Sequence, residues 1–121
     1  MDINALANSF VTHYYGLYGS AENRLGVLQL YAPDAQMVYN GRYCNGAQEI
    51  KDQIERVNFR TVAYQDPTVS ALDLRDRYLV SVVGKMQLDG DGPVFPFSHT
   101  FILGTNGQSF FIQGETFTIL T

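Results

Sequence analysis

Three side chains of this sequence together have the chemistry of an acid–base set, namely Tyr14, His99 and Glu115. A histidine changes its charge near neutral pH, a carboxylate accepts protons, and a tyrosine hydroxyl donates hydrogen bonds. If folding placed them in one pocket, they could move a proton on a bound molecule, so a small-molecule enzyme is one hypothesis. The simpler interpretation of His99 is a histidine that hydrogen-bonds a neighbouring side chain or lies at a dimer interface.

The segment DGDGP at 89–93 is the second chemically marked feature, because Asp89 and Asp91 alternate with glycines there. This composition is typical of an exposed hairpin loop. The Asp-x-Asp spacing also occurs in calcium loops, but the further oxygen ligands and the terminal glutamate are missing. His13 has no second ligand residue one helical turn away. We therefore expect no metal site and no cofactor.

Composition limits the classes of function. Eight Lys and Arg against twelve Asp and Glu give a net charge of −4 over 121 residues, so direct nucleic-acid binding is not expected. The length predicts one domain, 1–121. Cys44 is the sole cysteine, which fits a reducing, intracellular compartment. The sequence shows neither a signal peptide nor an apolar run long enough to span a membrane.

Apolar spacing predicts two helices at the start of the chain. One apolar stripe recurs in steps of three and four from residue 3 to residue 18, with Asp2 or Asn4 as its cap. A second helix is expected to begin near Ser20 and to stop before Pro33, since the residue before a proline disfavours helical geometry.

A short hairpin is expected next, at 37–44. Its Asn40–Gly41 pair accepts the positive φ angles of a type I′ turn. A third helix is then predicted over residues 46–57, with Asn45 as its cap.

The second half of the chain has the pattern of strands separated by turn-forming segments. We expect four of them, at 59–72, 77–88, 94–103 and 109–119. Three helices followed by a meander of long strands predict an α+β fold, with the helices on one face of a curved antiparallel sheet.

The expected sheet also has more apolar residues than three helices can cover. A second copy of the chain, packed on the other face, would supply the missing cover, so a homodimer is predicted. The residues assigned to that other face are Val80, Val82, Met86, Phe110 and Ile112.

Six motifs in order resemble the nuclear transport factor 2 family, in register over nearly the whole chain. They are FVTHYYGLY at 10–18, RLGVLQLY at 24–31, YNGRYCNGAQEI at 39–50, VNFRTV at 57–62, VVGKMQLDGD at 82–91 and ETFTIL at 115–120.

The resemblance implies a cone-shaped α+β fold that dimerises through its sheet and has an apolar cavity at its wide end. It also implies a carrier and not an enzyme, which binds the GDP form of the GTPase Ran and phenylalanine-glycine repeats of nucleoporins. The expected location is the cytoplasm and nucleus, enriched at nuclear pores. An aromatic side chain of Ran would enter the cavity, and acidic residues on the rim would pair with basic residues of Ran.

The resemblance also assigns residues to these sites. The rim falls on Asp89, Asp91 and Asn40, and the nucleoporin-binding position on Ile3. The cavity falls on Tyr39, Val57, Phe59, Val62, Phe97 and Phe117.

Some positions depart from the family pattern. Asn40 stands where the transport factor has a glutamate, and Ile3 where it has a tryptophan. Glu115 and Thr118 stand where an aspartate and an arginine are usual. An aromatic residue followed by Asn-Gly also occurs in the small subunit of the mRNA export receptor, a heterodimer, which is therefore an alternative. Isomerases and dehydratases of the same fold are the weaker alternative.

Overall fold

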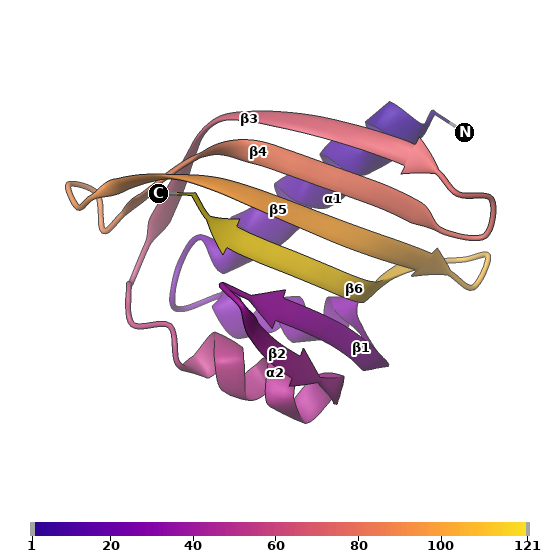
Figure 1. The fold of residues 1–121 in the computed structure, drawn as a ribbon, viewed down its shortest axis with the longest axis horizontal. Helices are drawn as coiled ribbons and strands as arrows, with labels where there is room; N and C mark the ends of the chain where they lie inside the picture. Colours follow the sequence, from indigo (N-terminus) through magenta and orange to yellow (C-terminus); the bar gives the residue numbers. More distant parts are fainter. Residues whose placement is uncertain (1, 121) are drawn as a thin grey trace.

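The computed structural model describes residues 2–120. A long helix, a short 3₁₀ segment and a hairpin come first, and a second helix leads into four long strands (Figure 1). The elements are α1 Ile3–Tyr18, η1 Arg24–Leu30, β1 Tyr31–Tyr39, β2 Arg42–Asn45, α2 Gly46–Glu55, β3 Val62–Asp73, β4 Tyr78–Leu88, β5 Val94–Thr105 and β6 Phe110–Ile119. The α+β class is confirmed. No helix among residues 2–120 is long and apolar enough to cross a membrane.

All six strands form one sheet in the order β2-β1-β6-β5-β4-β3. Every neighbouring pair is antiparallel except β1 and β6, which run parallel, so the expectation of a purely antiparallel sheet was wrong. The reason lies in the order of connections. Short turns join β3, β4, β5 and β6 in succession and make these neighbours antiparallel, whereas β1 and β6 are far apart in the sequence, so no short turn requires them to run antiparallel.

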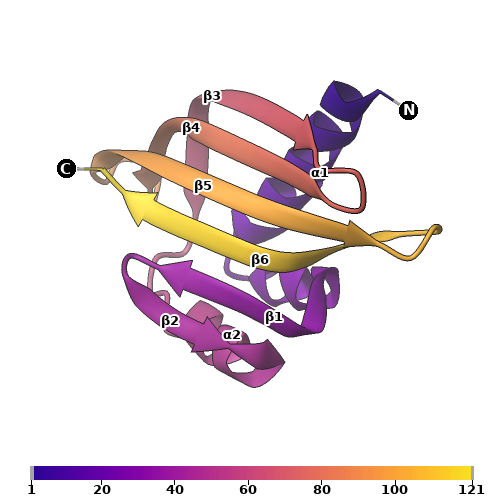
Figure 2. The same cartoon turned by 45° about the vertical axis from the view of Figure 1, so that its right-hand side comes forward.

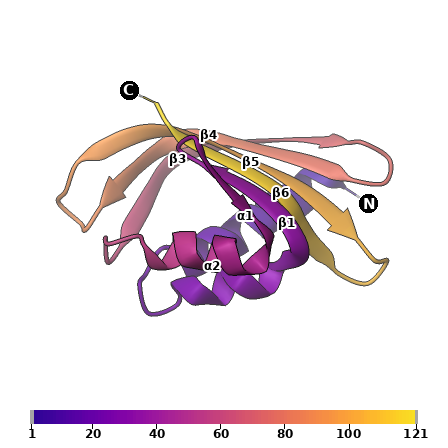
Figure 3. The ribbon, with the colours of Figure 1, turned by 60° about the horizontal axis from the view of Figure 1, so that its bottom comes forward.

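The sheet is strongly curved, and the helices lie against its concave face (Figures 2 and 3). Val80, Val82, Met86 and Ile112 are buried on this concave face, each 2% exposed or less. Their assignment to the other face was therefore wrong. Alternation along β4 instead turns Val83, which is 46% exposed, toward the convex side.

Helix α1 is where the periodicity predicted it. Asp2 is the cap, since its carboxylate accepts hydrogen bonds from the backbone N–H groups of Asn4 and Ala5. The buried face is rotated relative to the predicted stripe, because Tyr15 is buried while Leu6 is only half-buried. Tyr14, Tyr15 and Tyr18 are therefore buried beneath the sheet beside the smaller Ala7 and Val11.

The second helix differs from the prediction. It is a 3₁₀ helix that begins at Arg24 and not near Ser20, and it ends at Leu30. Pro33 then lies inside β1. The pairing of β1 with β6 shifts register between Tyr31 and Gln36, so proline, which has no N–H to donate, falls where the ladder is already interrupted.

The hairpin is confirmed, although β1 starts earlier than expected. Asn40 and Gly41 have φ angles of 48° and 84°, as a type I′ turn requires. Helix α2 ends at Glu55, two residues before the predicted end. Asn45 precedes α2 but makes no side-chain cap. Instead, Glu49 accepts a hydrogen bond of 2.8 Å from the backbone N–H of Asn45.

Strand β3 begins at Val62 and not at residue 59, and a bulge bends it near its start. The register between β3 and β4 shifts between Gln65 and Thr68, where Asp66 has a positive φ of 49°. On β4, a Cβ at Gly84 would lie 3.1 Å from the Cα of Pro67, a tight contact, so glycine lets the bent strand approach without displacing its neighbour. This bend helps to curve the sheet over the helices.

Candidate functional site

A cavity lies between the concave face of the sheet and the two α-helices. Its free volume is about 20 Å³, room for about one water molecule, so a larger group enters only if side chains at its mouth rotate. Helix α1, helix α2 and strands from both ends of the sheet contribute its walls, which are mainly apolar or aromatic. These side chains are Tyr18, Met37, Tyr39, Ile54, Tyr64, Met86 and Phe117.

A cluster of polar side chains forms the inner part of the cavity, with Glu115 at its centre. Glu115 is 6% exposed. Its Oε2 lies 2.5 Å from Nε2 of His99 and accepts a hydrogen bond of 3.1 Å from the hydroxyl of Tyr14. Its Oε1 accepts a hydrogen bond from the hydroxyl of Tyr31. Folding thus brings together Tyr14, His99 and Glu115, which the sequence marked only by their types.

Two further contacts complete the cluster. The hydroxyls of Tyr14 and Tyr31 lie 2.8 Å apart, and the hydroxyl of Tyr15 lies 2.9 Å from Nδ1 of His99. The ring of Tyr15 stacks on that of Tyr64 at 3.8 Å between centroids, which holds its hydroxyl in place. Both nitrogens of His99 are therefore satisfied by neighbouring side chains, as the simpler interpretation of this residue expected.

Burial decides the protonation of the tyrosines in this cluster. It raises the pKa of Tyr14 and of Tyr31 well above the ordinary value, and the negative charge of Glu115 raises both further. Burial, followed by the same charge, also raises the pKa of Tyr15. These hydroxyls remain protonated at neutral pH, so Tyr14 and Tyr31 serve as hydrogen-bond donors to Glu115.

The six residues assigned to the cavity by the resemblance are only partly brought together. Tyr39 and Phe117 line it, with their rings stacked at 5.1 Å between centroids. Phe97 is fully buried behind Phe117, and Val62 is buried at the start of β3. Neither residue lines the cavity, although Phe97 supports the lining residue Phe117 through a ring contact at 5.9 Å between centroids.

Val57 and Phe59 lie in the segment between α2 and β3, outside the cavity lining. The ring of Phe59 packs on the guanidinium of Arg24 at 4.5 Å. Arg24 is buried and donates to the backbone carbonyls of Tyr18, Phe59 and Arg60 at 2.9, 2.8 and 3.3 Å. Arg24 thereby attaches the loop that contains Phe59 to the C-terminal end of α1.

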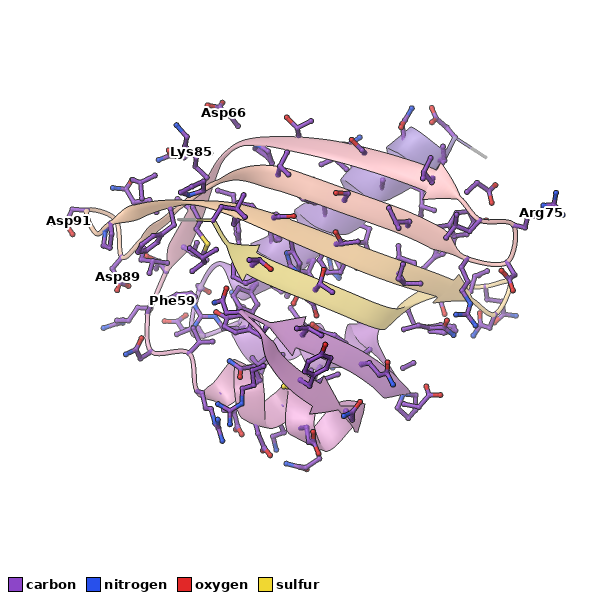
Figure 4. All side chains as sticks on the ribbon, viewed as in Figure 1. Phe59, Asp66, Arg75, Lys85, Asp89 and Asp91 are labelled. Carbon is purple, nitrogen blue, oxygen red and sulfur yellow. The ribbon has the colours of Figure 1, made fainter. Side chains whose placement is uncertain are left out.

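The acidic loop 89–93 lies at one end of the sheet, near Phe59 (Figure 4). Oδ1 of Asp89 accepts hydrogen bonds from the backbone N–H groups of Arg60 and Thr61, at 2.7 and 3.1 Å. Asp91 is exposed two residues later. One aspartate therefore anchors the loop while the other projects into solvent.

Asn40 lies at the end of β1, directly after the cavity residue Tyr39. Its side chain contacts the end of β6, where Oδ1 accepts a hydrogen bond of 2.8 Å from the backbone N–H of Ile119. Thr118, on the same strand end, is exposed.

Ile3 lies in the first turn of α1, half-buried against the core. The N-terminus is at the opposite end of the sheet from the loop 89–93 (Figures 1 and 4). The structure therefore places the expected nucleoporin-binding residue and the expected Ran-binding rim on separate surfaces.

Sequence reasoning missed several residues of this site, among them Tyr15, Tyr31 and Gln53. Tyr15 contacts His99 and Tyr31 contacts Glu115, each 84 positions away in the sequence, so no local sequence pattern predicts these contacts. Gln53 lines the cavity from α2 and is 8% exposed. Its signal was present in the sequence, because it lies between Ile50 and Ile54 on the inward face of an amphipathic helix, where a polar residue is unusual.

Comparisons with known proteins agree with this architecture. The model of the Nuclear transport factor 2 (NTF2) domain matches residues 6–119. The chain is 28% identical to nuclear transport factor 2B of Arabidopsis thaliana, covering 98% of this chain and 95% of that protein. It is 27% identical to nuclear transport factor 2 of Candida glabrata, again over 98% and 95%.

Solved structures show the same fold. Nuclear transport factor 2 from Cryptosporidium parvum superposes with a TM-score of 0.87 at 26% identity, over 98% of this chain and 94% of that one. A ketosteroid isomerase-like protein from Erwinia carotovora has a TM-score of 0.67 at 18% identity, over 98% and 94%, which shows the fold alone. Since the family model spans nearly the whole chain, from the apolar face of α1 to the end of β6, this protein belongs to the nuclear transport factor 2 domain family.

Proposed function

We propose that this protein is a nuclear transport carrier that binds Ran-GDP at the cavity and its acidic rim, for nuclear import of Ran. The observation that carries the proposal is the position of the acidic loop. Met86, near the end of β4, lines the cavity, and Asp89 follows directly after that strand. A ligand that inserts a side chain between the sheet and the helices would meet Asp89 and Asp91 as it enters.

In such a site, apolar residues and charged residues contribute to binding in different ways. An aromatic anchor packed against Tyr39 and Phe117 would supply apolar burial, while the aspartates would attract and orient a basic partner. The anchored carboxylate of Asp89 loses little freedom on binding, because two backbone N–H groups already hold it.

The proposal includes two further surfaces. Ile3 and the adjacent part of α1 would contact phenylalanine-glycine repeats of nucleoporins, with less contact area than a tryptophan would offer. A homodimer would form through the convex face of the sheet, around Val83. Such a carrier would be found in the cytoplasm and nucleus, enriched at pores, and would not be an enzyme.

Capture of purified Ran by the immobilised chain tests this function. We expect capture of Ran-GDP and not of Ran-GTP, weakening as salt rises, because exposed charge pairs are screened. Equal capture of both forms, or none at low salt, would exclude the carrier function. Capture of a nucleoporin fragment rich in phenylalanine-glycine repeats, measured in parallel, tests the second surface separately.

An acid–base enzyme is the second candidate, because Tyr14, His99 and Glu115 converge on the cavity. The contacts within the cluster argue against it. Both oxygens of Glu115 and both nitrogens of His99 already have partners, so a substrate would have to displace one of them. The side chains of this cluster hold one another in place by hydrogen bonds, and none of them has a free position for proton exchange with a ligand.

The export-receptor alternative rested on the Asn40–Gly41 pair. Asn40 has a local structural role here, since it supports both the turn and the end of β6. The pair therefore gives no independent reason to prefer a heterodimer.

A further inference from the structure

The 3₁₀ segment η1 and helix α2 pack against each other on the concave side of the sheet (Figure 3). An open hollow lies at each end of the groove between them. The first hollow, at the end of η1 and the start of α2, has a free volume of about 170 Å³. The second, at the start of η1 and the end of α2, has about 270 Å³. The two helices therefore run in opposite directions, and the groove has more room at each end than the central cavity has.

Apolar side chains from both helices line the hollows. A 3₁₀ helix places residues three apart above one another, so η1 contributes a single row. This row is Leu25, Leu28 and, directly after η1, Tyr31. The facing row of α2 is Ala47, Ile50 and Ile54. Since an apolar cavity of about 150 Å³ holds a benzene molecule, each hollow has room for one aliphatic side chain.

The spacing of the hollows can be measured along either helix. The η1 residues that line the first hollow are centred about five positions beyond those of the second, which at ~2.0 Å per residue gives roughly 10 Å. The corresponding offset along α2, at ~1.5 Å per residue, gives roughly 8 Å. A polyproline II helix has three residues per turn and a rise of ~3.1 Å, so its side chains at i and i+3 point the same way about 9 Å apart.

Other backbone conformations fit this spacing less well. In a β-strand, side chains on one face are about 7 or 13 Å apart. An α-helix reaches the required distance only at i+7, and it then places a third side chain between the two hollows. The polyproline II conformation therefore matches the groove best.

Exposed charges of opposite sign distinguish the two hollows. Lys51 lines the first and Glu55 the second, and neither forms an ion pair within residues 2–120. The dipole of α2 has the same sense, because its positive end lies at the first hollow and its negative end at the second. Arg24 also lines the second hollow, but its guanidinium is buried and held by three backbone carbonyls. The groove therefore favours an acidic group at the first hollow and a basic group at the second.

We propose that the groove between η1 and α2 binds a short polyproline II segment of a partner protein. Two aliphatic side chains of the segment, three residues apart, enter the two hollows. An acidic residue before or after them pairs with Lys51, and a basic residue at the other end pairs with Glu55. The segment does not enter the central cavity, although Ile54 lines both the cavity and the second hollow. This inference does not depend on Ran.

The test uses the peptide DLPPLK with both ends blocked, in which two prolines favour polyproline II and separate the leucines by three positions. It is titrated into the purified chain, and binding is followed by the backbone amide shifts of Leu28, Lys51 and Glu55. DAPPAK lacks both anchors, and DLPPPLK turns one anchor by a third of a turn around the peptide axis. We expect each to bind about tenfold more weakly, because the burial of a leucine is lost. Equal affinity of either control, or no binding of DLPPLK, would overturn the inference.

Matched variants of the chain locate the peptide. Ala47→Leu fills the first hollow from an exposed helical position, so the affinity for DLPPLK should fall about tenfold. Ala5→Leu, at an exposed position of α1, is the control and should bind DLPPLK as the wild type does. Wild-type affinity in a folded Ala47→Leu chain would contradict the inference.

Charge recognition is tested separately from apolar anchoring. Lys51→Gln and Glu55→Gln should each weaken DLPPLK about threefold at low salt and leave the uncharged peptide QLPPLQ unaffected. DLPPLD and KLPPLK bring a like charge to one hollow in either chain direction and should also bind about threefold more weakly. If KLPPLK bound as tightly as DLPPLK, attraction to the net charge of −4 would explain the binding and contradict the assigned polarity. Since Ran is absent from these titrations, their failure would leave the proposed carrier function untouched.

Discussion

Oδ1 of Asn40 accepts a hydrogen bond of 2.8 Å from the backbone N–H of Ile119, which ties the β1–β2 turn to the end of β6. The backbone N–H of Asn40 also donates to the carbonyl of Phe117 at 2.8 Å. With a φ of 48°, Asn40 adopts the left-handed conformation that asparagine and aspartate tolerate best. The position that departs from the family glutamate is therefore part of the structure of the turn.

Charge at this position is best tested with Asn40→Asp. Aspartate keeps the acceptor for Ile119 and tolerates the positive φ, so we expect the free energy of unfolding to stay within about 0.5 kcal/mol. The added negative charge at the rim should strengthen Ran-GDP capture at low salt. Asn40→Glu should lose the hydrogen bond and about 1–2 kcal/mol of stability in urea denaturation. Unchanged capture by Asn40→Asp would argue that the rim does not include this position.

We expect different roles for the two rim aspartates, with Asp89 stabilising the loop and Asp91 binding the partner. Asp91→Asn removes only an exposed charge, so it should weaken Ran-GDP capture and its salt dependence while leaving stability unchanged. Asp89→Ala also removes the acceptor for two backbone N–H groups and should cost about 1–3 kcal/mol in urea denaturation. Asp89→Asn, which can keep the acceptor, is the control. Capture that is unaffected in the Asp89→Asn, Asp91→Asn double variant would remove the rim from the proposal.

The buried tyrosines should make the protein sensitive to high pH. Burial raises the pKa of Tyr14, Tyr15 and Tyr31 above the ordinary value of 10.0. Below pH 10 both the folded and unfolded states are protonated, so these groups give no pH dependence. Above pH 10 only the unfolded state ionises, and the free energy of unfolding should fall by up to about 1.4 kcal/mol per pH unit for each tyrosine.

Urea denaturation between about pH 9 and 11 measures this loss. In Tyr15→Phe one of these tyrosines is absent, so the free energy of unfolding should fall less steeply with pH, by up to about 1.4 kcal/mol per pH unit. Tyr43→Phe, at a position that is 76% exposed, is the matched control for removal of a hydroxyl. The same slope in Tyr15→Phe and the wild type would contradict the assignment.

Arg24 should be among the most sensitive positions outside the cavity. Its guanidinium donates to three backbone carbonyls and packs on Phe59, and no carboxylate is needed to hold it. We expect Arg24→Met to lose about 2–4 kcal/mol and to speed hydrogen exchange at the Thr61 amide. Arg24→Lys keeps the charge but not the planar fork and should recover less than half of the loss. Full recovery by lysine would show that charge alone matters.

The convex face of the sheet offers a direct test of dimerisation. Val83 is 46% exposed on this face, whereas Tyr43 is exposed on the edge strand β2. If the homodimer forms through the sheet, Val83→Asp should shift the chain to monomer in light scattering, because a buried unpaired charge is costly. Tyr43→Asp should leave the dimer intact. A wild-type chain that is monomeric at micromolar concentration would favour the heterodimeric alternative.

Several elements were predictable because their signals are local. The first helix has an apolar repeat and an aspartate cap, and the turn at Asn40–Gly41 has the residues that positive φ angles require. The long strands lie between glycine- and aspartate-rich loops. Each of these signals acts over a few residues, so folding of the rest of the chain does not change it.

Other elements were mispredicted because their structure depends on distant partners. Pro33 indicates the end of a helix by local rules, yet it lies in β1, where the interrupted pairing with β6 tolerates a residue without an N–H. Val80 and Val82 could have faced either side of the sheet. Alternation along a strand identifies two faces but does not say which one the helices cover.

The sequence by itself determined the family, the α+β class and the residue types from which a site could be built. Only the tertiary structure decided which of them meet. Tyr14 and Glu115 are 101 positions apart and are joined by a hydrogen bond inside the core, while Val57 and Phe59 lie outside the cavity lining despite their assignment to it. The physical reason is that a site is made by the packing of helices against a curved sheet, and the geometry of that packing depends on contacts across the whole chain.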